Sequence, residues 1–377
     1  MIYWDNNATT PLAPEVLEAM LPYLTEQFYN PSAAYRAAKR VRQAVDEARE
    51  KVAALLGVQA EEIIFTSGGT EATNTALAQL GRVLTPATEH PATLRVVEVG
   101  GGSLCPVLPS GIVDTAAWAS MLHGHDGAGF AWANHETGVI QPVAELCEAA
   151  QAAGVRVHID AVQAAGKVPL RLNELPALAY ASISAHKLHG PKGVGALYVR
   201  TGAPLHPYIL GGGQEGARRS GTENVPGIIG FGKAAELALA AEAEYAALSR
   251  LRVRFLAALA EAGIQVVQNG DAAPRLPHVL NMRIPGCSAE SLFLLLEPAG
   301  LLCSAGSACT SAEPHPSHVL LAMGLSAAEA RECLRLSWNR FSTEQEADEA
   351  AACFINAVRK IRAVQSSRTG PVMVYRP

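Results

Sequence analysis

The middle of the chain alternates short apolar runs with segments whose apolar residues recur at helical spacing. The apolar runs occupy 61–67, 129–134, 155–160, 180–185 and 195–200. Strands that alternate with helices favour a parallel sheet, because each connection between parallel strands has to cross back over the sheet. The pattern therefore predicts an α/β fold in which helices flank a mostly parallel sheet.

A different pattern follows this alternation. A long helical segment over 231–263 is expected to carry the chain from one domain to another. After it, strand-like runs such as "HVLNMRI" at 278–284 mix with helices. We expect a large domain over 15–255 and a smaller α+β domain formed by 1–14 and 256–377.

Composition excludes several classes of protein. Of the 377 residues 49% are hydrophobic, which is enough for a substantial core. The formal net charge of −5 gives no general attraction to nucleic acid or to an anionic membrane. The start, "MIYWDNNATT", lacks a secretory signal, and no apolar run has the length of a membrane span. We expect a cytoplasmic protein that binds neither nucleic acid nor membrane.

The cysteine content favours reduced thiols. The chain has seven cysteines, an odd number, and no CxxC pair. Disulfide frameworks use cysteines in pairs, and zinc ribbons need closely spaced ligands. We therefore expect neither a disulfide scaffold nor a resident metal.

Polar residues gather where the expected strands end, at 67–70, 134–136, 158–160 and 184–187. In open α/β sheets, ligands bind beyond the carboxyl ends of the strands. The segment "TSGGTEATN" places Gly69 and Thr70 between a strand and a helix, where backbone N–H groups can receive a phosphate. An ordinary glycine turn with Thr70 as the helix N-cap is the alternative.

Two further strand ends carry ionisable groups. Asp160 ends a hydrophobic strand, where a carboxylate needs a cation or several hydrogen-bond donors; capping a helix over "AVQAAG" is the alternative. Lys187 follows an apolar run in "SISAHKLHGPKG", and an amine in a partly dry pocket can form a Schiff base with an aldehyde. A surface lysine in a turn is the alternative there. Together, a phosphate cradle, a carboxylate and a lysine match the requirements of pyridoxal phosphate.

A second signal lies in "CSAGSACTSAEPHPSHVL" at 303–320, where small residues surround Cys309. This composition is typical of an exposed loop that presents a thiol to a ligand and then carries it elsewhere. The alternatives are a buried cysteine in a turn, or a metal site formed by Cys309, His315 and His318 without standard zinc spacing. Further on, Arg335 alternates with apolar residues as on a strand, and a buried arginine requires a carboxylate, from a ligand or from its own chain.

Taken together, these motifs resemble the cysteine desulfurases of the NifS/IscS type, which are fold-type I pyridoxal phosphate enzymes of the class-V aminotransferase family. The resemblance runs nearly end to end, through "DNNATTPLAPEV", "FTSGGTEATN", "NHETGVIQPV", "HIDAVQAAGK", "SISAHKLHGPKGVGALYVR", "GGGQEGARRSGTEN", "SAGSACTSAEPHPSHVL" and "LRLSWNRFSTEQE". It implies a seven-stranded sheet, a homodimer and, from the long cysteine loop, membership of the first of two desulfurase groups.

The resemblance also implies roles for matching cofactor residues. Lys187 would bind the cofactor aldehyde, with Asp160 on the pyridine nitrogen, Gln163 near the phenolic oxygen and His90 stacked on the ring. His135 takes the place of an asparagine that contacts the cofactor in the family, so we expect a retained contact with altered electronics, unless Asn134 substitutes for it. The phosphate would be held by Gly69, Thr70, Ser184, His186 and, from a second subunit, Thr222.

For the reaction, the resemblance implies conversion of L-cysteine to L-alanine. Arg335, helped by Asn30, would clamp the substrate carboxylate, and Cys309 would take the sulfur as a persulfide after His90 helps to form its thiolate. A sulfur-acceptor protein such as an iron–sulfur scaffold would then collect the sulfur for iron–sulfur cluster or thio-cofactor biosynthesis. The alternatives are a selenocysteine lyase or an aminotransferase of the same fold, and a catalytically silent homologue that acts as a binding subunit.

Overall fold

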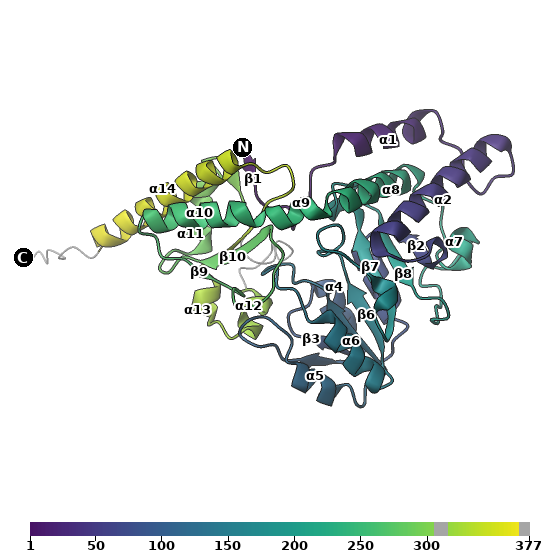
Figure 1. Ribbon diagram of the computed structural model, residues 1–377, viewed down its shortest axis with the longest axis horizontal. Coiled ribbons are helices and arrows are strands. Elements are labelled where there is room, and N and C mark those ends of the chain that lie inside the picture. Colours follow the sequence, from purple (N-terminus) through teal and green to yellow (C-terminus); the bar gives the residue numbers. More distant parts are fainter. Residues whose placement is uncertain (305–315, 369–377) are drawn as a thin grey trace, which may run out of the picture.

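The computed structural model describes residues 1–304 and 316–368. Cys309 and His315 lie outside these ranges. The described residues form a larger region around one sheet and a smaller region at the other end of the molecule's long axis, where the N-terminus and the last helix lie (Figure 1).

Short apolar runs form the central sheet of the larger region. Within the described residues its strand order is β2-β8-β7-β6-β5-β3-β4. The strands are β2 (Ile63–Thr66), β3 (Val83–Pro86), β4 (Ser103–Cys105), β5 (Gly127–Ala131), β6 (Arg156–Asp160), β7 (Leu178–Ser184) and β8 (Gly195–Val199). Neighbours from β7 to β4 run parallel, whereas β8 is antiparallel to both β2 and β7. The predicted mostly parallel seven-stranded sheet is confirmed; the five strands located in the sequence have ends shifted by a few residues, and β3 and β4 were not located there.

Helices cover both faces of this sheet (Figure 1). One face packs against α1 (Pro14–Thr25), α2 (Arg36–Leu56), α5 (Thr115–Met121), α6 (Val143–Ala152) and α8 (Val225–Ala240). The other face packs against α3 (Gly69–Leu77) and α4 (Pro91–Val99). Successive strand residues point to opposite faces, so Ile63 and Phe65 enter the first core while Ile64 enters the second. Burial on both faces explains why most positions of these strands are apolar.

The smaller region has its own core. Strands β9 (Val267–Gln268), β10 (Val279–Arg283) and β12 (Cys333–Ser337) form an antiparallel sheet, and β1 (Ile2–Tyr3) pairs with β11 (Leu301–Leu302). Helices α10 (Ser249–Glu261), α11 (Ala289–Leu296) and α14 (Glu344–Arg368) contribute to this core, in which the aromatic rings of Trp4, Phe255, Trp338 and Phe354 contact one another. Shorter helices are α7 (Gln214–Ala217), α12 (His318–Ala322) and α13 (Ala327–Ala330).

The long helical segment expected over 231–263 is interrupted twice. Three helices, α8, α9 (Glu242–Ala247) and α10, follow one another between the two regions (Figure 1). At the breaks the backbone hydrogen bonds tighten to three-residue spacing, from Ala241 N–H to the Ala238 carbonyl and from Leu248 N–H to the Tyr245 carbonyl. Apolar residues keep helical spacing across both breaks, so the sequence pattern does not reveal them.

The two cores divide close to the expected domain limits. Ala13 belongs to the larger core, whereas Tyr245 and Phe255 already belong to the smaller one. The division into 15–255 and 1–14 with 256–377 stays a prediction. No helix within the described ranges is long and apolar enough to cross a membrane.

One glycine decides how closely the loop before α3 approaches the sheet. A Cβ on Gly195, the first residue of β8, would lie 2.7 Å from the Cα of Gly68 and 2.7 Å from the carbonyl oxygen of Ile183. Both neighbours are backbone atoms, which cannot rotate away. Gly195 therefore lets the loop that begins α3 rest directly on β8.

We predict that Gly195→Ala destabilises the protein by about 1–3 kcal/mol, because the added methyl group forces backbone apart in a packed site. Gly213→Ala is the matched control, since a Cβ there meets nothing within 4 Å and its φ is −86°. Denaturant unfolding measures both variants. Equal stability of the two would contradict the close approach of Gly195 to Gly68.

Candidate active site

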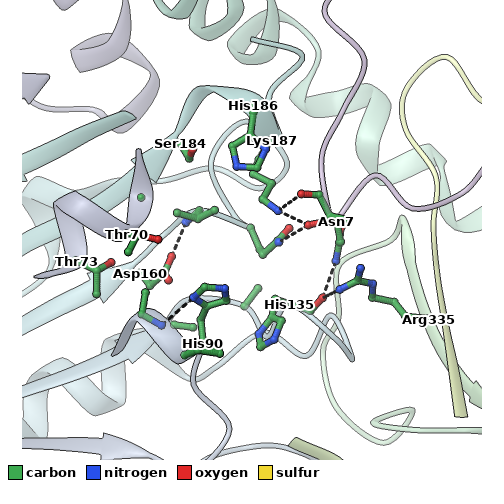
Figure 2. A pocket seen from close by; sticks show the side chains of 18 residues that line it. Asn7, Thr70, Thr73, His90, His135, Asp160, Ser184, His186, Lys187 and Arg335 are labelled. Atoms are coloured by element: carbon green, nitrogen blue, oxygen red, sulfur yellow. Dashed lines mark hydrogen bonds between the residues drawn. The ribbon is translucent and has the colours of Figure 1, made fainter. Parts of the chain in front are cut away.

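A cavity of about 330 Å³ opens at the carboxyl ends of the parallel strands, where the sequence predicted a ligand site (Figure 2). Residues that follow β2, β3, β5, β6 and β7 all reach it. Most of the predicted site residues line it: Gly69, Thr70, His90, His135, Asp160, Gln163, Ser184, His186, Lys187 and Arg335.

Two predicted residues within the described ranges stand apart from this cavity. Asn30 is exposed in the turn between α1 and α2, where its side-chain oxygen accepts a hydrogen bond from Ser32 N–H. Thr222 lines a separate cavity beside Ser67. Cys309 lies outside the described residues. The roles of Asn30, Thr222 and Cys309 stay predictions.

The N-terminus of α3 faces the cavity without a side-chain cap. The helix begins at Gly69 with Gly68 as N-cap, so the alternative that Thr70 is the N-cap is wrong. The first intrahelical bond runs from Ala72 N–H to the Gly68 carbonyl. The N–H groups of Gly69 and Thr70 therefore have no partner within the helix and can receive an anion.

Lys187 reaches the cavity from the turn that follows β7. Its amine donates hydrogen bonds to the backbone carbonyls of Asn7 and Ala8, the latter at 2.7 Å (Figure 2). The alternative of a solvent-facing lysine is wrong, because the N-terminal segment crosses in front of it. Thr10 fastens this segment to the same turn, through hydrogen bonds to the His186 carbonyl.

Asp160 lies across the cavity from Lys187. One carboxylate oxygen accepts a hydrogen bond from Val162 N–H at 2.9 Å. The segment over 161–166 forms turns, so the expected helix that Asp160 would cap is wrong. Burial raises the pKa of Asp160, while His90 and Lys187 oppose the rise. A carboxylate in this position gains from a further cationic partner within the cavity.

Three histidine rings lie near one another here, and two of them, His90 and His135, line the cavity. His90 caps α4, and its Nδ1 accepts a hydrogen bond from Ala92 N–H at 3.1 Å. The His135 ring lies 5.3 Å from His90 and 6.4 Å from His318, centroid to centroid. Burial lowers the pKa of His90 and places that of His135 well below its usual range. These two rings are therefore neutral near pH 7, and His90 carries its proton on Nε2.

The position of Asn134 decides between two open alternatives. Its side-chain oxygen accepts hydrogen bonds from Glu136 N–H and from Thr137, and its amide donates to the Thr88 carbonyl. Asn134 thus holds the turn together and does not line the cavity, whereas His135 does. The geometry favours His135 as the residue that contacts a ligand.

Arg335 comes from β12 of the smaller region, and only 2% of its surface is exposed. Its guanidinium donates to the Asp5 carboxylate at 2.7 Å and to the His135 carbonyl at 3.0 Å. The chain therefore supplies the carboxylate that a buried arginine requires. Arg335 Nε has no partner among the described residues, so at least this donor is unused.

Sequence reasoning missed several residues of this site. Asn7 and Ala8 accept hydrogen bonds from Lys187 through their backbone carbonyls. Every residue has such a carbonyl, so the residue type does not indicate this role. Glu89 is buried beside His90, and burial raises the pKa of its carboxyl to about 8. The sequence signal for Glu89 is its position directly before His90 in "TEHP". Lys167 is buried behind Gln163, with no sequence signal beyond its place in "HIDAVQAAGK".

Comparison with known proteins identifies the family. Residues 2–349 match the family described as aminotransferase class-V. Cysteine desulfurases from Trichormus azollae and Sinorhizobium fredii are 41% and 42% identical to the chain, over 97% and 96% of it and 94% and 97% of their own lengths. A solved NifS-like protein superposes with a TM-score of 0.86 at 34% identity, covering 97% of this chain and 99% of its own. The chain belongs to the class-V aminotransferase family.

The donor set of the cavity fits the cofactor of this family, pyridoxal phosphate. The bare N-terminus of α3 suits a phosphate, and Asp160 suits a protonated ring nitrogen. Lys187 supplies an amine for the aldehyde, on the same cavity wall as Ser184 and His186. Aldehyde, ring nitrogen and phosphate thus each find a complementary group.

We predict that Lys187→Ala abolishes the visible absorbance of bound cofactor, because this amine would be the aldehyde's covalent partner. Lys192→Ala is the matched control, since Lys192 is exposed a few residues further on. Absorbance spectra of the two purified variants, with unfolding curves to verify folding, decide the outcome. Wild-type visible absorbance in folded Lys187→Ala would contradict the assignment.

Proposed function

We propose that this chain is a pyridoxal phosphate-dependent cysteine desulfurase. It converts L-cysteine and the Cys309 thiol into L-alanine and a Cys309 persulfide. The single observation that carries the proposal is the cavity in which Lys187, Asp160 and the uncapped start of α3 face one another. Full-length similarity to proteins named cysteine desulfurase supports the choice of substrate.

Residues on three sides would hold the cofactor. Lys187 binds the aldehyde, Asp160 pairs with the ring nitrogen, and the start of α3 with Ser184 and His186 holds the phosphate. When bound, the cofactor withdraws electrons from the substrate Cα. Burial and neighbouring lysines lower the pKa of His186 to about 4, so its ring is neutral and can donate a hydrogen bond without adding charge.

Arg335 and Asp5 prepare the site for the substrate carboxylate. The guanidinium is held by Asp5 and by the His135 carbonyl, so its direction is fixed before any ligand arrives. Because Arg335 also lines the cavity, an incoming carboxylate meets an oriented cation there. A second similar solved structure, titled "SspA in complex with cysteine", superposes with a TM-score of 0.80 at 31% identity, covering 91% of this chain and 100% of its own.

Proton transfer at the substrate Cα falls to Lys187, and His90 faces the cavity as a hydrogen-bond donor. The Lys187 amine takes up and returns a proton at the substrate Cα. His90 presents Nε2–H to the cavity because its Nδ1 is engaged by the Ala92 N–H. In this tautomer the neutral ring is a hydrogen-bond donor. Its predicted help in forming the Cys309 thiolate requires the other tautomer, with Nε2 as the acceptor.

The proposal also includes two protein partners, a second copy of this chain and a sulfur acceptor. A homodimer would bring Thr222 of the partner subunit to the phosphate, since Thr222 of the same chain lines a different cavity. A sulfur-acceptor protein, such as an iron–sulfur scaffold, would collect the persulfide sulfur. The expected cytoplasmic location stays a prediction.

We predict that Cys309→Ala abolishes the release of sulfide and alanine from L-cysteine and leaves the cofactor's visible absorbance intact. Cys353→Ala, a partly exposed cysteine on α14, is the matched control and retains activity. Sulfide and alanine are assayed together. Turnover that survives in Cys309→Ala would exclude the persulfide route and favour another reaction of the fold.

A further inference from the structure

A second lysine lies buried behind the cavity wall. Lys167 follows β6, and only 4% of its surface is exposed. Its amine donates a hydrogen bond to the side-chain oxygen of Gln163 at 3.3 Å. Burial, with the charge of Lys187, lowers the pKa of Lys167 to about 7. Its charge also acts on three histidines that surround it: His186, His189 and His278.

Such a lysine is costly to keep. No carboxylate contributes to the pKa of Lys167 among the described residues, so its charge is not compensated by an acid. Burying an amine without an acid destabilises the fold. An apolar side chain of similar length would fill the same volume without this cost, which points to a function for the amine itself.

The hydrogen bonds of Gln163 indicate the role of the Lys167 amine. A lysine amine donates hydrogen bonds to its neighbours, so the Gln163 oxygen must face Lys167 and the Gln163 nitrogen must face the other way. That nitrogen donates to the Asn7 carbonyl at 3.1 Å. The same carbonyl accepts a hydrogen bond from Lys187. Lys167, Gln163, Asn7 and Lys187 thus form one connected row, and Gln163 lines the cavity.

We propose that Lys167 is a positioning residue that fixes the Gln163 amide with its N–H groups toward the cavity. The assignment rests on the proposed function, in which Gln163 lies near the phenolic oxygen of the cofactor. With its N–H groups inward, Gln163 offers a donor to that anionic oxygen. A flipped amide would instead place the side-chain oxygen of Gln163 against the phenolic oxygen of the cofactor. A lysine is suited to the task because it donates whether or not it is charged.

A double-mutant cycle tests the proposal. The probe is pyridoxal phosphate, titrated into the full chain after removal of bound cofactor. Lys167→Met is expected to raise the dissociation constant about three- to tenfold, the size of one hydrogen bond. In the Gln163→Ala background the same substitution is expected to change it less than twofold, because Lys167 acts through Gln163. Lys167→Met is likewise expected to shift the visible absorbance maximum, and to shift it less in the Gln163→Ala background.

Each outcome decides the proposal. An equal loss of affinity in both backgrounds, or no loss in either, would overturn it. If the unsubstituted chain binds pyridoxal phosphate without Lys187-dependent absorbance, the proposed function fails and this assignment fails with it. Normal binding by the unsubstituted chain without coupling between Lys167 and Gln163 overturns the positioning assignment alone.

The pH dependence of stability verifies that Lys167→Met folds and that the amine is buried. Between pH 7 and 10.5 the unfolded chain holds a proton on Lys167 that the folded chain has lost, so wild-type stability rises with pH across this window. Lys167→Met lacks this rise. We therefore expect the variant to equal or exceed the wild type at pH 7 and to lose that advantage by pH 10.5. Parallel stability curves, or a variant less stable at pH 7, would contradict the burial of the amine.

Discussion

The site depends on how the Lys187 amine is held at the edge of the sheet. Two backbone carbonyls, of Asn7 and Ala8, accept its hydrogen bonds. These carbonyls belong to a segment that starts in the smaller region, where β1 pairs with β11, and then crosses to the larger one. The reactive amine is therefore placed by both cores at once, and Arg335 enters the same cavity from the smaller region. Loss of either core would displace one side of the site.

Burial sets the charges around this amine. It lowers the pKa of His90, His135 and Lys167 and raises those of Asp160 and Glu89. Each shift favours the neutral form, because charge is poorly solvated in the cavity walls. A ligand that carries its own phosphate and ring charges is then the main source of charge in the site. The α3 N-terminus and Asp160 are the groups that would gain from its arrival.

The sequence predicted what local patterns determine. Alternating periodicity gave the parallel sheet, and polar residues at strand ends gave Asp160 and Lys187, because parallel strands bring their carboxyl ends together. Features that depend on packing between regions could not be predicted. The Lys187 acceptors are backbone atoms, and the breaks between α8, α9 and α10 keep helical spacing. The Arg335 carboxylate is Asp5, 330 residues away in the chain, and no local pattern connects the two.

The most direct test of the account is to identify the lysine that carries the cofactor. Reduction of the purified protein with borohydride fixes the cofactor to its lysine, and peptide mapping by mass spectrometry then locates it. The account predicts modification of Lys187. Modification of the buried neighbour Lys167 instead, or of no lysine at all, would contradict it.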